Sequence, residues 1–442
     1  MASSPVSQAM RLLAALTTLA TLAIAGAARA DALPRLTIPR LQAVREAIHA
    51  LQAKRQEIAR PGPYQDYRAV IHLHSKFSHD SRGTIEEILA AAKATHTKVL
   101  MFTEHPSKAY DPVVNGYRGI KDGVLCIPGL ETNGFLAFPT QSFKGTQNLP
   151  PQEFADLALR KGSLLFLSHL EERLDWQVKG LTGTEIYNTH AQLLLDKKLQ
   201  KAVDNPVWMF KSIGLFQKYP QEAFGALQDY PAMYLKKWDS LCEKHPATGV
   251  AANDSHQNTG FVVKLLADDK VRLEDPLGEE LMEVNLAKVP KLQPMAAGKK
   301  PGDTILALRL DPYPVSMLHT GTHLLMKDLT EKTVRETLEA GRAYVSFDWL
   351  ADATGFDFAA VSAAGRQEMG SQLPYADGLQ FRAQAPLPVH WRLMRNGAVD
   401  RESDGPTFES AVKQPGIYRI EAWLEVAGER KIWILSNPIY LR

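Results

Sequence analysis

IHLHSKFSHD, residues 71–80, ends a short apolar run that begins at Ala69 and has the pattern of a β-strand. Alternate residues of a strand point to the same face, so the imidazoles of His72 and His74 project together. Asp80 follows in the next loop. Imidazoles and a carboxylate at such close spacing are ligands that zinc, manganese and iron accept. The stretch therefore predicts a divalent metal site at the carboxyl end of a strand.

Downstream of this stretch, short apolar runs alternate with helical patterns. Thr84 and Glu87 form a capping box that predicts a helix over 85–95. Buried strands are predicted at 99–103, 123–129, 163–168, 184–187 and 249–252. Strands that alternate with helices predict a parallel sheet covered by helices, and this number of strands favours an α/β barrel over an open sheet.

Side chains that bind metals recur where these predicted strands end. They are Glu104, His105, Glu131, His169, Glu185, His190, Asp254 and His256. A parallel β/α barrel brings the carboxyl ends of its strands to one open mouth, so these side chains are expected to lie together. Other histidines are expected at the surface, at helix ends or outside the mouth: His79, His96, His245, His319 and His323.

The order of these elements resembles the PHP family, the polymerase-and-histidinol-phosphatase domain. The matching stretches are HLHSKFSHDSRGTIEEILAAAKATHTKVLMFTEH (72–105), IPGLETN (127–133), SHL (168–170), EIYN (185–188) and NDSH (253–256). Two positions depart from the family pattern, because Glu104 stands where it usually has Asp and Arg82 where its turn usually has Gly. The resemblance implies a distorted (β/α)7 PHP-type barrel that binds two or three divalent metal ions, Zn, Mn or Fe.

The resemblance also implies a ligand set, position by position. The first ion would be held by His72, His74, Glu131 and Asp254. Glu131 would bridge to a second ion, which would also be held by His169 and His190. The third ion would be held by Asp80, His105 and His256. Catalysis is expected at Asp254 and His256.

The chemistry that the resemblance implies is hydrolysis of a small phosphoester by metal-activated hydroxide. Lys76, Arg82 and Arg173 follow ligand positions in the chain, and they either bind phosphoryl oxygens or are solvated surface charges. Two alternatives stay open. One is an amidohydrolase-like, metal-dependent hydrolase of a C–N or C–O bond, and the other is a non-catalytic protein that binds envelope or glycan ligands. The complete ligand set weighs against the second.

The composition is that of a folded and nearly neutral chain. Of its 442 residues, 45% are hydrophobic and 23% are charged, and the formal net charge is +2. This balance excludes intrinsic disorder and argues against nucleic acid as a partner. Cys126 and Cys242, the two cysteines, either form a disulfide or are buried free thiols.

Residues 1–30 have the pattern of a cleaved signal peptide. Arg11 precedes an apolar run over 12–24, and the small residues that follow end in Ala28-Arg29-Ala30. The apolar run is too short to span a bilayer. The pattern predicts a periplasmic or secreted protein with no membrane span after cleavage, and it leaves the oligomeric state open.

The mature chain is predicted to contain four parts. Residues 31–66 form a helical lead-in, residues 67–294 the PHP-type barrel, residues 295–304 a linker, and residues 305–442 a smaller, β-sandwich-like domain. The last domain is expected either to narrow access to the barrel mouth or to cover apolar barrel surface.

Overall fold

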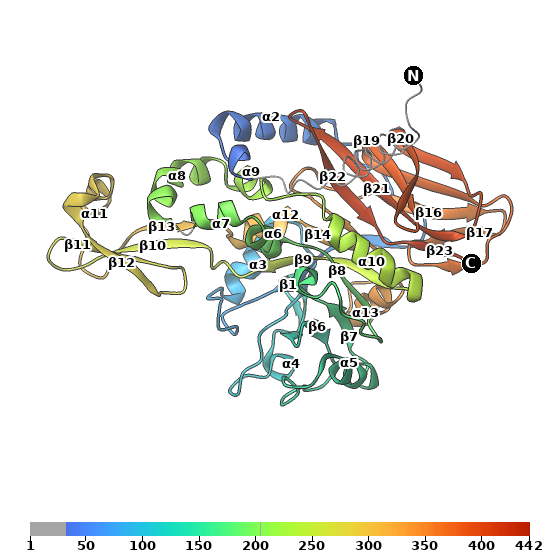
Figure 1. Cartoon of the computed structure of the whole chain (residues 1–442), viewed down its shortest axis with the longest axis horizontal. Coiled ribbons are helices and arrows are strands. Elements are labelled where there is room, and N and C mark those ends of the chain that lie inside the picture. The colour runs from blue at the N-terminus through green and yellow to red at the C-terminus, as the bar shows by residue number, and fades with distance from the viewer. Residues whose placement is uncertain (1–31, 204) are drawn as a thin grey trace, which may run out of the picture.

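The structure is a computed structural model that describes residues 32–203 and 205–442. The predicted signal peptide, residues 1–30, lies outside the described residues. Among the helices that are described, none is both long and apolar enough to cross a membrane. The protein is mixed α/β, with one large sheet and a separate four-stranded sheet that forms an arm at the left of Figure 1.

Parallel strands form the part of the large sheet that carries the predicted metal ligands. These strands are β1 (Gln65–Leu73), β2 (Val99–Met101), β4 (Val124–Ile127), β7 (Leu164–Leu167), β8 (Gly183–Asn188) and β9 (Thr248–Ser255). β1 lies between β2 and β9, β8 lies between β7 and β9, and β4 pairs with β2. All of these pairings are parallel, as the apolar runs of the sequence predict.

The large sheet also contains antiparallel strands, which the sequence analysis did not predict. β3 (Gly119–Lys121) pairs with β4, β5 (Leu130–Thr132) forms a hairpin with β6 (Phe135–Phe138), and β6 pairs with β7. Asn133 and Gly134, between β5 and β6, have φ angles of 53° and 83°. A two-residue hairpin turn requires such positive φ angles, and so short a connection leaves no room for a crossover helix. The large sheet is therefore mixed, and the (β/α)7 barrel stays a prediction.

Helices pack against these strands, as the alternating pattern predicts. In α3 (Ile85–Ala94), the hydroxyl of Thr84 accepts from the Glu87 N–H at 3.3 Å and the Glu87 carboxylate accepts from the Thr84 N–H at 3.0 Å. The predicted capping box is thus confirmed. The other helices before the arm are α2 (Ile38–Lys54), α4 (Pro112–Asn115), α5 (Pro151–Arg160), α6 (Thr189–Leu195), α7 (Lys197–Val203), α8 (Pro206–Lys218), α9 (Pro220–Gly225) and α10 (Ala232–Lys244).

The arm is an antiparallel sheet with the strand order β12, β11, β10, β13. Its elements are β10 (Gly260–Leu265), β11 (Lys270–Glu274), β12 (Glu280–Asn285), α11 (Gln293–Ala296) and β13 (Thr304–Arg309). β13 pairs with β10, because Leu306 and Leu308 are buried in one apolar cluster with Phe261 and Val263. Residues on both sides of the predicted linker, 295–304, therefore belong to one sheet.

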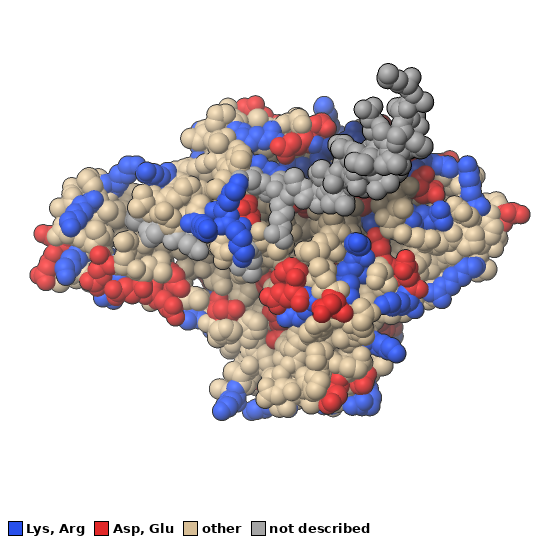
Figure 2. Space-filling model, in the orientation of Figure 1, with Lys and Arg blue, Asp and Glu red and all other residues tan. Residues whose placement is uncertain are grey.

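Figure 2 shows acidic side chains gathered along the lower edge of the arm. Glu280 and Glu283 of β12 are exposed, and Arg272 of β11 lies 3.1 Å and 2.8 Å from their carboxylates. These charges are therefore solvated and partly paired on the surface, where each ion pair contributes at most about 1 kcal/mol.

The C-terminal region is rich in β-strands, as predicted, and it continues the large sheet. β14 (Gly321–Met326) pairs antiparallel with β1, and β15 (Ala343–Ser346) connects β14 to β22 (Glu429–Ser436). The remaining elements are α12 (Tyr313–His319), α13 (Glu331–Glu339), β16 (Asp357–Ser362), β17 (Gly365–Glu368), β18 (Gln372–Leu373), β19 (Gln380–Arg395), β20 (Ala398–Ala411), β21 (Gly416–Val426) and β23 (Ile439–Leu441).

One apolar core joins the central strands to the C-terminal strands. It contains Tyr187 of β8 and Trp238 of α10 together with Trp391 of β19 and Trp433 of β22, all of them fully buried. Large aromatic side chains contribute most of the buried area in such cores. The C-terminal strands therefore cover apolar surface of the central part, and a role in substrate access stays a prediction.

We expect a chain that ends at Pro301 to be insoluble or unfolded. It lacks β14, which pairs with β1 from Gln65↔Met326 to Ala69↔Thr322, and it exposes Tyr187 and Trp238. Each large side chain that loses its burial costs about 1.5–3 kcal/mol. Expression yield and far-UV circular dichroism on heating measure the effect. A soluble, monomeric chain of this length that unfolds cooperatively would contradict the expectation.

Candidate metal centre

The side chains predicted to bind metal converge where β1, β7 and β9 end. Their ligand atoms form three clusters, each within 4.8 Å: His74, Asp80, His105 and His256; His72, His74, Glu131 and Asp254; and His190, Asp254 and His256. His74, Asp254 and His256 each belong to two clusters. The three clusters are therefore continuous, and together with His169 we call them the metal centre.

The cluster around His72 contains the four residues that the resemblance implies for the first ion. His72 Nε2 lies 3.1 Å from Glu131 Oε2 and 3.1 Å from Asp254 Oδ1. His74 Nε2 lies 3.4 Å and 3.7 Å from the same two oxygens. Both imidazoles are fully buried. Two nitrogens and two carboxylate oxygens thus converge on one point, which is the donor set of a divalent transition metal.

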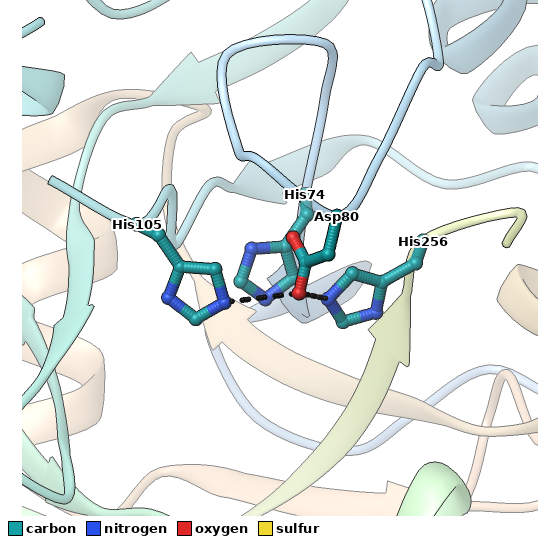
Figure 3. A group of neighbouring side chains, drawn as sticks. All are labelled: His74, Asp80, His105 and His256. Atoms are coloured by element: carbon teal, nitrogen blue, oxygen red, sulfur yellow. Dashed lines mark ion pairs between the residues drawn. The ribbon is translucent and has the colours of Figure 1, made fainter. Parts of the chain in front are cut away.

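In the second cluster, Asp80 lies between two imidazoles (Figure 3). Asp80 Oδ2 is 3.3 Å from His105 Nε2 and 3.2 Å from His256 Nε2. The ring of His74 stacks on the ring of His256 with 4.0 Å between centroids. The resemblance implies Asp80, His105 and His256 for the third ion, and the structure places His74 beside them.

His169 and His190 approach the metal centre from different elements. His169 Nε2 lies 3.1 Å from Glu131 Oε1, so Glu131 presents one oxygen to His169 and the other to His72. This arrangement suits a carboxylate that bridges two ions. His190 is grouped with Asp254 and His256 rather than with Glu131 and His169. The cause is local, since His190 lies in the first turn of α6, which Asn188 caps and which packs on β9.

Three residues of the metal centre have backbone conformations in the left-handed region, which residues other than glycine rarely adopt. The φ angles of His72, His169 and Asp254 are 71°, 48° and 50°. The pairing of β1 with β9 shifts its register at His72. A non-glycine residue in the left-handed region costs of order 1–3 kcal/mol, and such residues gather at functional sites. These conformations occur at or near the ends of β1, β7 and β9, where the three side chains enter the metal centre.

Four imidazoles share one orientation, with Nε2 facing the centre and Nδ1 within hydrogen-bond distance of another polar group. His72 Nδ1 lies 2.7 Å from Glu185, and His169 Nδ1 lies 3.0 Å from Glu171. His74 Nδ1 lies 3.0 Å from the hydroxyl of Ser78, and His256 Nδ1 lies 3.0 Å from the carbonyl oxygen of Asp254. Metal-ligating histidines usually have such partners, which fix the ring and leave the other nitrogen free.

The charges of the metal centre shift one another's pKa values. Burial alone would raise the pKa of Glu131, but the charge of His72 and hydrogen bonds from His169, His72 and His74 together hold that pKa well below its usual range. Burial alone would lower the pKa of His169, but hydrogen bonds to Glu131 and Glu171 raise it to about 12. Burial and the neighbouring His256 lower the pKa of His74 to about 3. Positive charge close to these carboxylates thus stabilises their ionised form, and a divalent cation would do the same.

Three buried ligand atoms of the metal centre have no hydrogen-bond partner. They are His74 Nε2, Asp80 Oδ1 and Asp254 Oδ1. An unsatisfied buried polar atom costs about 1–3 kcal/mol, so such atoms are uncommon. Each of these three atoms has a lone pair that it can donate to a metal cation. The residues present therefore fit divalent metal ions, whose number and identity stay predictions.

The three predicted substrate-binding cations differ in their contacts. Arg82 is exposed, and its Nη1 donates to the carbonyl oxygens of His79 and Ser81. Arg173 donates to the carbonyl oxygens of Ser168 and His169 and so supports the loop that carries His169. Lys76 is exposed, with Nζ 5.9 Å from the centre of the Phe77 ring. Their role in substrate binding stays a prediction.

Residues expected away from the site lie outside the three clusters found among the described residues. His79 is exposed. His319 is buried with its Nε2 2.9 Å from the hydroxyl of Tyr187, and His323 is buried between two aspartates. Cys126 and Cys242 are both buried and free, so of the two alternatives the free thiols are the one that the structure contains.

Of the residues that orient the imidazoles, Glu185 and Asp254 were predicted at strand ends, whereas Ser78 and Glu171 were not predicted to have a role. Ser78 lies four positions after His74 in the opening stretch, and Glu171 lies two positions after His169. Tyr234 of α10 donates a hydrogen bond to Glu171. The closeness of Ser78 and Glu171 to ligand positions was a usable signal, whereas no local pattern connects Tyr234 to His169.

No family model and no curated protein matches the chain. A solved structure that resembles it comes from Bacteroides vulgatus ATCC 8482 and is a two-domain protein containing a predicted PHP-like metal-dependent phosphoesterase. The two chains are 12% identical, with a TM-score of 0.36, and the match covers 86% of this chain and 98% of the other. The family resemblance therefore rests on the motifs of this chain.

Proposed function

We propose that the protein is a metal-dependent phosphoesterase of the PHP type that hydrolyses a small phosphoester. The observation that carries the proposal is the continuity of the three clusters through His74, Asp254 and His256. A site for one structural ion needs a single closed set of four ligands. Adjoining sets that share a carboxylate suit ions placed side by side, an arrangement that two-metal hydrolysis of phosphoesters uses.

The residues of the chain divide the work of such a site. His72, His74, Glu131 and Asp254 would hold one ion, Asp80, His105 and His256 would hold another, and Glu131 would join the first to an ion beside His169. Bound divalent ions supply an acidified water and neutralise charge that develops on the phosphoryl group. Asp254 and His256 lie where the clusters meet, so we assign catalysis to this pair, with the Asp254 carboxylate as the proton acceptor and the His256 imidazole as a ligand that holds the ion beside it.

A substrate panel tests this proposal on the purified protein. Phosphomonoesters, phosphodiesters and amides are incubated with the protein after treatment with a chelator and after addition of Zn²⁺, Mn²⁺ or Fe²⁺. We expect release of phosphate or alcohol from one ester class, only with added metal. Cleavage of amides alone would instead identify an amidohydrolase-like enzyme, and no cleavage with full metal binding would identify a binding protein.

We further propose that the protein is exported and that residues 1–30 are removed. The support is the sequence pattern of that segment, which lies outside the described residues. Mass spectrometry of the N-terminus tests the proposal, with a mature chain that begins at Asp31 as the expected result. An intact N-terminus on protein from the periplasm would contradict cleavage.

A further inference from the structure

Glu104, which replaces the usual Asp of the PHP pattern, accepts hydrogen bonds from the loop that follows His74. Its side chain is 1% exposed. The carboxylate accepts hydrogen bonds from the backbone N–H of Ser75, from the hydroxyl of Ser75 and from the hydroxyl of Ser78. Glu104 does not belong to the three clusters found in the described part of the chain. Its partners are therefore hydroxyl and backbone groups rather than a metal ion.

The hydroxyl of Ser78 connects this carboxylate to the metal centre. Ser78 Oγ lies 2.7 Å from Glu104 Oε2, 3.0 Å from the backbone nitrogen of His105 and 3.0 Å from His74 Nδ1. A carboxylate only accepts hydrogen bonds and a backbone N–H only donates them. The single proton of the hydroxyl therefore points to Glu104, and one lone pair accepts from His105. The other lone pair faces His74, so the proton of that contact lies on His74 Nδ1.

We propose that Ser78 and Glu104 are positioning residues that hold the His74 imidazole with its proton on Nδ1 and its Nε2 lone pair facing the metal centre. The consequence for metal binding rests on the proposed function. The position of the proton on the imidazole does not, because it follows from the hydrogen bonds alone.

The orientation of His74 matters because its Nε2 belongs to two of the three clusters. The other tautomer would direct an N–H group at Glu131 and Asp254, and that nitrogen could not bind a metal. The negative charge of Glu104, acting through the hydroxyl, also polarises the imidazole and strengthens Nε2 as a donor. An outer partner of this kind typically changes metal affinity by about 10–100-fold.

The structure offers a matched control for this proposal. Ser75 and Ser78 are both buried and both donate a hydroxyl hydrogen bond to Glu104. Of the two hydroxyls, that of Ser78 also contacts His74. If the serines only close the loop over Glu104, Ser75→Ala and Ser78→Ala should have the same effect. If the proposal holds, the two variants should differ.

The first experiment determines the tautomer of His74 in the full chain after metal removal. Long-range ¹H–¹⁵N spectra of histidine-labelled protein distinguish the two tautomers, and the His74→Gln variant identifies the signals. We expect the Nδ1–H form in the wild type and in Ser75→Ala, and a mixture of both forms in Ser78→Ala. An Nε2–H form in the wild type, or no change in Ser78→Ala, would overturn the proposal.

The second experiment measures Zn²⁺ affinity by competition with a chelator. We expect Ser78→Ala to weaken the affected site by about 10–100-fold, whereas Ser78→Thr, which keeps the hydroxyl, should retain the wild-type affinity. Ser75→Ala should also stay close to the wild type, and equal losses in both alanine variants would contradict the proposal. A wild-type protein that binds no divalent metal would refute the proposed function, while the tautomer of His74 would still test the positioning role.

Discussion

The Asp254→Asn variant is expected to lose bound metal and at least about 100-fold of its hydrolytic rate, while the chain stays folded. The amide has the size of the carboxylate and can still accept the hydrogen bond that Asn188 donates to Asp254 Oδ2. It removes a negative charge that two of the three clusters share. Removal of an outer partner alone costs a metal site about 10–100-fold, so loss of a direct ligand should cost at least as much. Metal analysis and the substrate panel measure both losses.

The same substitution at a second buried carboxylate is the control. Asp357 is 2% exposed and is paired with Arg60 and Arg366, far in sequence from the ligand positions. Asp357→Asn should lower stability but leave metal content and turnover per folded molecule unchanged. His72→Ala should behave like Asp254→Asn, because His72 Nε2 lies 3.1 Å from Asp254. Normal metal content in both ligand variants would refute the assignment of the centre.

The His323→Leu variant is expected to lose about 3–5 kcal/mol of unfolding free energy without a change in metal affinity. His323 Nδ1 lies 2.7 Å from Asp66, and its Nε2 lies 3.2 Å from Asp348, which also pairs with Arg68 at 2.7 Å. Two cations and two anions thus balance in a buried network that joins β1, β14 and the segment after β15. Leucine leaves one buried carboxylate without its cation, which costs about 3–5 kcal/mol. Denaturant unfolding measures the loss.

The pH dependence of stability provides a second measurement of this network. Burial alone would lower the pKa of His323, but the charges of Asp66 and Asp348 raise it to about 10. Because folding raises the pKa of His323, the stabilisation that its protonated form contributes is complete below pH 6.5. That stabilisation is lost as the pH rises toward 10. Burial alone would raise the pKa of Asp348, but Arg68 and His323 hold it well below its usual range. The stabilisation that ionised Asp348 contributes is therefore present above pH 4 and is lost only at a more acidic pH.

His319 is the matched control for His323, because both are fully buried histidines. Burial and the charge of Lys431 lower the pKa of His319 to about 3, so it is neutral, and its hydrogen-bond partner is the hydroxyl of Tyr187. His319→Leu should cost about 1–3 kcal/mol, the penalty for a lost buried hydrogen bond, and should keep the alkaline loss of stability. Equal losses of unfolding free energy in both variants would contradict the role of the network. So would a His323→Leu variant that loses stability at alkaline pH as the wild type does.

Some elements could be predicted because their signals are local. The helix start at Thr84 depends on a residue three positions away. The period of a strand predicts a common face for His72 and His74, and both reach one cluster, although His72 has a φ angle of 71° and β1 ends before His74. The hairpin of β5 and β6 also had a local signal in Asn133-Gly134, but the prediction was a parallel strand over 123–129 with Glu131 just after its end. The pairing of β13 with β10 across a predicted linker had no local signal, since it depends on burial against distant residues.

The sequence by itself determined which donor groups the centre contains, because imidazoles and carboxylates at strand ends can bind metal ions wherever the fold brings those ends together. Only the tertiary structure decided which nitrogen of His72 faces inward. That choice depends on the partner of Nδ1, and for His72 the partner, Glu185, lies 113 residues away in the chain. His319 and His323 stand four positions apart, yet burial and the charge of Lys431 keep His319 neutral, whereas His323 is charged between Asp66 and Asp348. The charge of a buried side chain is set by the neighbours that folding brings to it, and those neighbours come from strands far apart in the sequence.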